Sequence, residues 1–142
     1  MKKIVLLLMM AGSAIYAGAQ CEKSLNMTGP KMEIIGDAGQ VINSREAAIL
    51  IELTKTTITL SFDNNPESVL SGPVKEFKCN WKEPYKNGTM FIKAEISDQR
   101  GDMKHVVLNI EAKDGKIILL GDAEERPNEK LKVSIDKIEE KS

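Results

Sequence analysis

Apolar residues recur at every second position over several stretches of the chain, and this alternation constrains the fold more than any other feature. Side chains along a β-strand point alternately to its two faces, so the pattern indicates strands that bury one face only. The clearest examples are residues 77–82 and 91–96. Comparable alternation occurs at 49–53, 58–62, 106–112, 117–119 and 131–135.

Two dipeptides between these stretches predict tight hairpin turns, because both central residues of such a turn need a positive φ. Asn87-Gly88 follows the stretch around Trp81 and precedes the one around Ala94. A two-residue turn there sets Trp81 opposite Ala94 and Cys79 opposite Ile96. The apolar faces of both strands then lie on the same side, as a half-buried pair requires.

The second dipeptide, Asp114-Gly115, sets Ala112 opposite Ile117 and Ile110 opposite Leu119 by the same arithmetic. Between the two hairpins, residues 98–102 predict a five-residue turn. That turn pairs Ile92 with Leu108 and Ala94 with Val106. Four consecutive strands then share one inner face, crossed by a row made of Trp81, Ala94, Val106 and Ala123.

The flanking segments give weaker signals. Residues 44–53 could begin as a helix, but their β-branched content favours a strand. A turn at Lys55-Thr56 would pair Leu53 with Ile58. Asn65 followed by Pro66, with Gly72-Pro73 as a stop, predicts one short helix near 66–71.

At the two ends of this array the signals are simpler. Met32 and Ile34 form a weak first strand, and the acidic run 122–129 reads as a loop. Residues 131–136 form a last strand whose charged outer face suits a sheet edge. The predicted fold is therefore all-β: an antiparallel meander of about eight strands forming a small barrel or sandwich.

The N-terminus has the pattern of an export signal. Two lysines precede an apolar run, and Ala17-Gly18-Ala19 is a peptidase cleavage pattern. We expect residues 1–19 to be a cleaved signal peptide and residues 20–142 to form a single domain. The address would be the periplasm, the cell surface or the medium. Lipid anchoring at Cys21 is not expected, because Gln20 stands where a lipoprotein motif wants a small residue.

The two cysteines, Cys21 and Cys79, would then reside in an oxidising compartment. An even count there favours a disulfide between them, which would draw the N-terminal segment across one end of the core.

Composition excludes several classes of function. The chain has 142 residues and a net charge of −1, with two of its lysines in the signal. The expected mature chain carries no basic excess and no long apolar segment, so neither nucleic acid binding nor a transmembrane span is predicted.

Nothing in the sequence predicts catalysis, a metal or a cofactor. His105 is the only histidine, and the register places it on the outer face opposite Glu95. A catalytic histidine needs a nucleophile or a second acid–base group beside it, and no motif supplies one. We therefore expect a surface histidine paired with a carboxylate, and a protein that is not an enzyme.

Two sets of residues are candidates for binding. Phe91, Val107, Ile118 and Leu120 fall on the outer face, where a cluster of apolar residues is typical of a surface covered by a second layer or by a partner. This favours a protein-interaction or structural module of the cell envelope, with an unknown protein partner. Phe77, Trp81 and Ile92 face inward, and the alternative is a carrier that holds a small apolar ligand there, similar to lipocalins in architecture alone.

Overall fold

The computed structural model describes residues 23–141, which form a closed antiparallel barrel of eight strands with one additional strand. The predicted signal peptide and Cys21 lie outside the described residues. The strands are β1 (Ser24–Gly36), β2 (Val41–Leu53), β3 (Thr57–Phe62), β4 (Leu70–Glu83), β5 (Asn87–Ser97), β6 (Met103–Lys113), β7 (Lys116–Ala123), β8 (Arg126–Ile135) and β9 (Lys137–Lys141).

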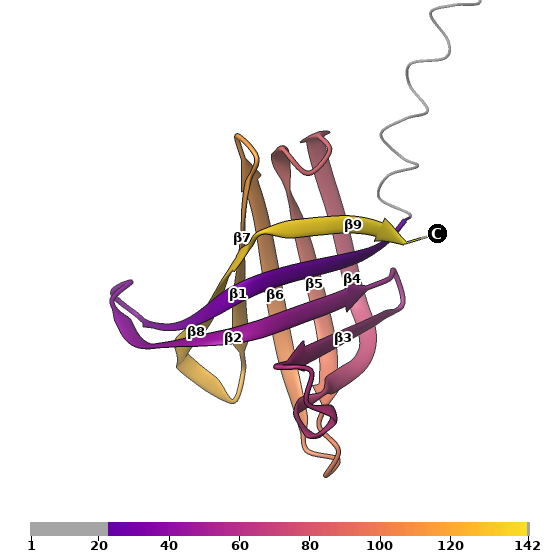
Figure 1. Ribbon diagram of the computed structural model, residues 1–142. Coiled ribbons are helices and arrows are strands. Elements are labelled where there is room, and N and C mark those ends of the chain that lie inside the picture. Colours follow the sequence, from indigo (N-terminus) through magenta and orange to yellow (C-terminus); the bar gives the residue numbers. More distant parts are fainter. Residues whose placement is uncertain (1–22, 142) are drawn as a thin grey trace, which may run out of the picture.

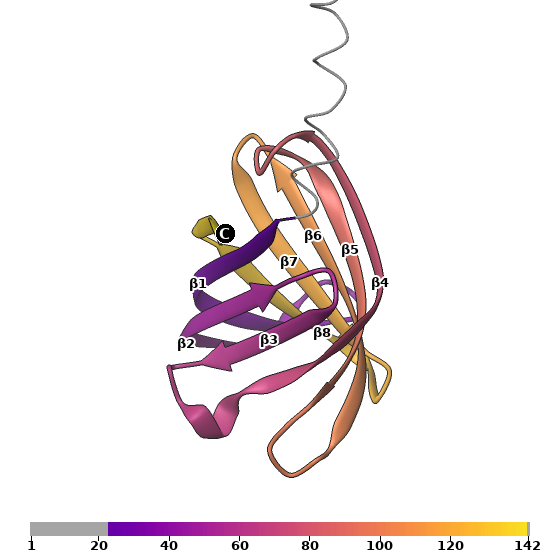
Figure 2. The same cartoon turned by 90° about the vertical axis from the view of Figure 1, so that its right-hand side faces the viewer.

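From β1 to β8 each strand pairs with the next along the chain, and β1 closes the barrel by pairing with both β2 and β8. The last strand, β9, pairs with the first half of β1. Two sets of strands cross at a large angle: β1, β2, β3 and β9 run across the front, and β4 to β7 stand behind them (Figure 1). The view from the side shows the two sets enclosing a common interior (Figure 2).

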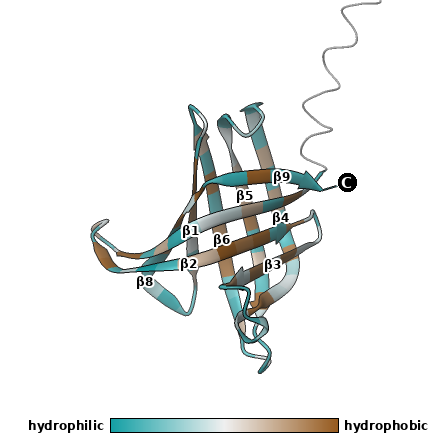
Figure 3. Cartoon of the chain, in the orientation of Figure 1, coloured by the Kyte–Doolittle hydropathy of each residue, from teal (hydrophilic) through white to brown (hydrophobic). Residues whose placement is uncertain are grey.

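The interior is filled by the inward-facing apolar residues of the barrel strands. Among the described residues, twenty hydrophobic residues are buried and no polar or charged residue is. Met27, Ile51, Ile58, Met90 and Ile92 are among those with the least exposure. The strands carry most of the hydrophobic residues and the turns at the two ends are largely hydrophilic (Figure 3).

The central registers confirm the predicted pairing of three strands. Ile92 lies opposite Leu108 and Ala94 opposite Val106. The Asp114-Gly115 turn has positive φ at both residues (52° and 83°). It sets Ala112 opposite Ile117, and the same ladder sets Ile110 opposite Leu119.

Among the predictions for the flanking segments, the strand at 44–53 is confirmed and the helix near 66–71 is shorter than predicted. Residues 44–53 are strand, and Leu53 pairs with Ile58. The helix near 66–71 is a single 3-10 turn, Pro66–Ser68, because β4 already begins at Leu70. Its start follows the prediction: the Asn65 side chain accepts a hydrogen bond from the backbone N–H of Glu67 (3.0 Å).

The prediction of a turn at Asn87-Gly88 is wrong. The chain turns at 84–86, where Tyr85 has φ 60°, and both Asn87 and Gly88 belong to β5. Trp81 therefore lies opposite Gly88 rather than Ala94, and Cys79 opposite Met90 rather than Ile96. The inner row that was predicted to contain Trp81 contains Val74 in its place.

A packing argument explains this register. A Cβ added to Gly88 would lie 2.7 Å from the Cα and 2.9 Å from the Cε3 of Trp81, so only glycine lets the two strands approach here. The Asn87 side chain is used elsewhere, since its Oδ1 accepts from the backbone N–H of Asp114 (3.2 Å). The shift moves each partner by six residues, and an even shift leaves every side chain on its predicted face.

The remaining corrections concern the two ends of the sheet. β1 begins at Ser24, well before Met32. The acidic run 122–129 is a short turn at 124–125 between β7 and β8. Residues 131–136 are not at an edge, because β8 pairs with β7 on one side and β1 on the other. Barrel closure is a long-range event, so the charged outer face of β8 gave no local sign of it.

Candidate functional site

A hollow of about 630 Å³ lies on the outside of the barrel, and it includes half of the predicted partner surface. Its apolar floor is made by Ile118 and Leu120 of β7 with Ile35 of β1. All three side chains are partly exposed. The floor forms where β8 lies between β1 and β7. The β1–β8 ladder sets Ile35 opposite Lys130, and the β7–β8 ladder sets Leu120 opposite Lys132. We call this feature the outer hollow.

Charged side chains surround the floor. Lys113, Lys116 and Lys132 line the hollow together with Glu111 and Asp114. Within residues 23–141 none of these three lysines forms an ion pair, and neither do the two acids. The hollow thus combines an apolar floor with a local excess of positive charge, on a chain whose net charge is −1.

The other two residues of the predicted partner surface extend the same face. Phe91 of β5 lies opposite Asn109, which in turn lies opposite Leu120, so these three residues form one row across the outer face. The Nζ of Lys78 lies 5.7 Å from the centre of the Phe91 ring. Val107 pairs with Asp122. Both Phe91 and Val107 are partly exposed, and neither lines the outer hollow itself.

Sequence reasoning missed Ile35 and Lys132 as members of this site. Ile35 sits almost a hundred residues before Lys132, and only the β1–β8 pairing brings their strands together. The alternation in β8 did predict that Lys132 faces outward, but nothing local indicates what stands beside it.

The predicted inward-facing residues lie in the core or against it, and Trp81 is placed toward the end of the barrel that carries the β4–β5 turn, which we call the Trp81 end. Ile92 is fully buried, and Phe77 and Trp81 pack against the core at partial exposure. Trp81 meets Tyr85 edge to face, with 5.6 Å between ring centroids, and its buried Nε1 has no hydrogen-bond partner among the residues that the structure describes. A ligand held beside Ile92 would have to displace core side chains.

At this end of the barrel, polar contacts join Tyr85 to Glu140 and Glu140 to Lys23. The Tyr85 hydroxyl donates to Glu140 of β9 (2.7 Å), and the Lys23 Nζ lies 2.9 Å from the same carboxylate. Desolvation and the Glu140 hydrogen bond raise the pKa of Tyr85 above its usual range. Lys23 and Tyr85 together lower the pKa of Glu140. Cys79 also packs against the core here, opposite Met90.

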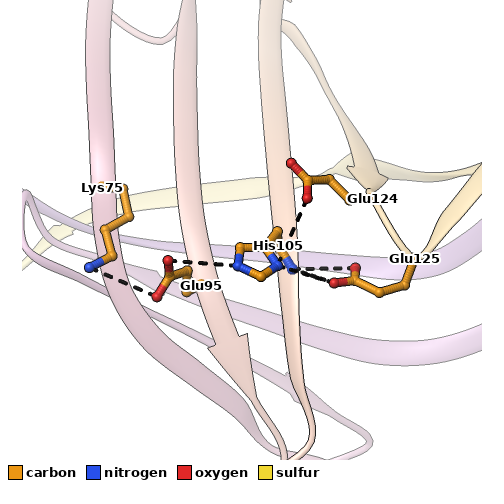
Figure 4. Close-up of polar contacts among 5 residues, drawn as sticks. All are labelled: Lys75, Glu95, His105, Glu124 and Glu125. Carbon is orange, nitrogen blue, oxygen red and sulfur yellow. Dashed lines mark hydrogen bonds and ion pairs between the residues drawn. The ribbon is translucent and has the colours of Figure 1, made fainter.

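His105 lies opposite Glu95 on the outer face, as predicted. Figure 4 shows its ring between Glu95 on one side and Glu124 and Glu125 on the other. Its Nε2 is 3.7 Å from Glu95, and its Nδ1 is 3.2 Å from Glu125 and 3.9 Å from Glu124. Backbone N–H groups of Glu125 and His105 hold the pKa of the Glu125 carboxyl below its usual range.

The polar partners of the His105 ring within residues 23–141 are all glutamates. Carboxylates can orient or protonate an imidazole, but they supply no nucleophile for it to activate. The described residues also contain no group of three or more His, Cys, Asp or Glu side chains arranged to hold a metal ion. No helix in residues 23–141 has the length and apolar character needed to cross a membrane.

Comparison with known proteins returned neither a matching family model nor a matching curated protein, so the site is interpreted from its own geometry.

Proposed function

We propose that this protein is an exported, non-enzymatic interaction module of the cell envelope, and that its outer hollow binds an acidic segment of a partner protein. The observation that carries the proposal is the apolar floor of Ile35, Ile118 and Leu120 beside three lysines that form no ion pair with any residue from 23 to 141. Such a site suits a segment in which an apolar side chain is flanked by Asp or Glu. The apolar side chain would fill the hollow and the acids would meet the lysines.

The concave shape favours a protein partner over a lipid surface. Proteins that lie on a bilayer insert protruding apolar residues between the headgroups. Here the apolar residues line a hollow that they share with three lysines, so an apolar side chain of the partner must enter the hollow to reach them. Binding through a few buried anchors within a polar rim is typical of protein interfaces.

Export and a disulfide between Cys21 and Cys79 belong to the same proposal. Cys79 lies two residues before Trp81 and packs against the core, which is compatible with a bond that holds the N-terminal segment over the Trp81 end. The test is mass spectrometry of the protein recovered from the cell envelope, with and without reduction before alkylation. An N-terminus at Gln20 and a mass gain only after reduction support the proposal, whereas a retained signal or freely alkylated thiols refute it.

The carrier alternative places an apolar ligand at Phe77, Trp81 and Ile92. It receives less support, because Ile92 has no exposed surface and the surrounding core is filled.

The partner proposal is tested with three synthetic peptides and NMR spectra of the isotopically labelled protein. The first alternates Leu and Phe with Asp and Glu, the second replaces the acids with Lys, and the third replaces Leu and Phe with Ser. We expect only the first to shift the amides of Ile118, Leu120 and Lys132 in a saturable way. Equal binding of the first two peptides, or shifts confined to other strands, would contradict the proposal. Binding to anionic vesicles in preference to the acidic peptide would indicate a membrane partner instead.

A pair of variants shows whether the hollow itself is responsible. Leu120→Glu puts a negative charge on the floor and should raise the Kd for the acidic peptide by more than about tenfold. The matched control is Ile42→Glu, because Ile42 is 54% exposed and lies outside the hollow. The affinity of this control variant for the acidic peptide should stay within about twofold of that of the unsubstituted protein. An equal loss of peptide affinity in both variants would show that the hollow is not the binding site.

A further inference from the structure

The end of the barrel opposite Trp81 contains a second hollow, of about 450 Å³, whose lining includes residues at inward-facing positions of the strands rather than on the outer face. Its apolar lining consists of Met32 and Ile34 of β1, Phe62 at the end of β3 and Leu131 of β8. Met32 lies opposite Val133 of the core, and Ile34 opposite Leu131. The four side chains are only partly buried, so this hollow is an open cup above the filled core. We call it the mouth cup.

The cup exists because the wall of the barrel is incomplete here. β2 pairs with β3 only from Ile49 to Leu53, so residues 41–48 have β1 as their one neighbour. At the point of separation, Asp63 has φ 55° and turns the chain away. Its backbone N–H donates to the carbonyl of Ala48 (2.7 Å), and its Oδ1 accepts from the N–H of Ala48 (2.9 Å). The apolar residues on the far wall are thereby left uncovered.

The mouth cup has a surplus of positive charge. Three cations line it, Arg45, Lys104 and Arg126, against a single acid, Asp63. Asp63 is already paired with Arg45 (2.9 Å), and Arg126 lies 3.6 Å from Glu129. Lys104 forms no ion pair among residues 23–141. It lies opposite Ile96, whose side chain is 3% exposed, so Lys104 occupies an inward-facing position of β6.

An inward-facing lysine without a counter-ion is unusual in a barrel, because an ammonium group at partial burial gains stability from an anion. The charge and the apolar lining lie within the same hollow. A ligand that satisfies both has one apolar chain and one anionic group. The volume lies within the range of small-molecule sites, though near its lower end.

We propose that the mouth cup binds a single-chain carboxylate amphiphile, such as a medium-chain fatty acid. The carboxylate would pair with Lys104, and the chain would lie on Met32, Ile34 and Leu131. This site is independent of the outer hollow, since the two share no lining residue. It also differs from an interior site at Trp81, which lies at the other end of the barrel.

Three probes with the same ten-carbon chain test this proposal on the full chain at neutral pH: decanoate, decanol and decyltrimethylammonium. Their binding is followed in NMR spectra of the labelled protein. We expect decanoate to bind about tenfold more tightly than decanol, as a charge-assisted hydrogen bond predicts, and the ammonium compound more weakly still. The shifted amides should be those of Met32, Ile34, Lys104 and Leu131. Absence of decanoate binding, or an equal affinity for all three probes, would overturn the proposal.

A charge-neutralising variant completes the test. Lys104→Gln keeps most of the aliphatic stem and should weaken decanoate by about tenfold while leaving decanol unchanged. The matched control, Lys113→Gln, removes an equally unpaired lysine from the outer hollow and should leave decanoate affinity unaltered. Thermal melting of both variants verifies that they fold. Shifts at Ile118 and Leu120 would assign the binding to the outer hollow, and a changed Trp81 fluorescence would assign it to the Trp81 end. Either result refutes the mouth cup as the site.

Discussion

The neighbouring residues Leu119 and Leu120 offer the sharpest test of whether the outer hollow is a free surface or part of the core. Leu119 faces inward and is 1% exposed. Leu120 faces outward, between Asn109 and Lys132, and is partly exposed. The two substitutions Leu119→Ala and Leu120→Ala remove the same atoms from consecutive positions of one strand, so differences in strand propensity largely cancel.

The expected magnitudes follow from burial. Truncating a fully buried leucine removes its transfer free energy and leaves a cavity, which together cost about 2–5 kcal/mol. Leu120 already meets water on one side and leaves no closed cavity, so its truncation should cost less than about 1 kcal/mol. For a domain of this size, roughly 4 °C of Tm corresponds to each kcal/mol. Leu119→Ala should therefore lower Tm by roughly 8–20 °C, and Leu120→Ala by less than roughly 4 °C.

The assay is urea unfolding followed by the fluorescence of Trp81, the only tryptophan, together with thermal melting. A gentler pair repeats the comparison: Ile117→Val in the core and Ile118→Val on the floor of the hollow. If Leu120→Ala destabilises the monomer as much as Leu119→Ala does, the floor is covered in solution. The proposed docking surface would then be a piece of core, and the reasoning from its exposure would be refuted.

Three further predictions follow from backbone geometry and polar contacts. Gly88→Ala should lower the free energy of unfolding by at least about 2 kcal/mol, because a Cβ meets backbone atoms of β4. Gly101→Ala meets no neighbouring atom and has only an unfavourable φ, so it should cost about 1 kcal/mol. Equal losses in urea unfolding would show that the Trp81–Gly88 approach does not matter. In the chain from Gln20 onward, whose only tyrosine is Tyr85, absorbance titration should show ionisation well above pH 10, the usual value, and Glu140→Gln should reduce the shift. Because the unfolded chain loses this proton first, the stabilisation is complete below about pH 10 and is lost as pH rises; unchanged titration in Glu140→Gln would exclude the hydrogen bond as a cause. Asp63→Ala should speed hydrogen exchange at the Ala48 amide, whereas Asp63→Asn retains an acceptor oxygen and should preserve protection; equal exchange in both would contradict the role given to Asp63.

The sequence predicts which face of the sheet a strand residue occupies more reliably than it predicts which residue stands opposite on the next strand. Every assignment of an inner or outer face in β4 to β7 agrees with the structure, since it depends only on the period of two along each strand. The β6–β7 register was also predictable, because Asp114-Gly115 is the turn that the chain makes. The β4–β5 register was not. Asn87-Gly88 has the composition of the same turn, but the space beneath the Trp81 ring requires the glycine within the strand. The close approach of β4 and β5 at Gly88, where a Cβ would meet the Asn80 carbonyl and Trp81, therefore overrides the turn preference of the dipeptide.

Both hollows depend on the pairing that no local pattern could reveal. Closure of the barrel brings β1 against β8, and this single event places Ile35 beside the outer lysines and Ile34 beside Leu131 of the mouth cup. Ile34 and Ile35 are adjacent in sequence, and each lies in a different hollow because they point to opposite faces of one strand. A one-residue slip of β1 against β8 would exchange them. The β1–β2 ladder shifts register twice near this pair, between Gly29 and Lys31 and between Ile34 and Ile35, whereas the β1–β8 register runs without a shift from Met32 to Gly36. Both candidate binding sites therefore depend on this one unbroken β1–β8 register.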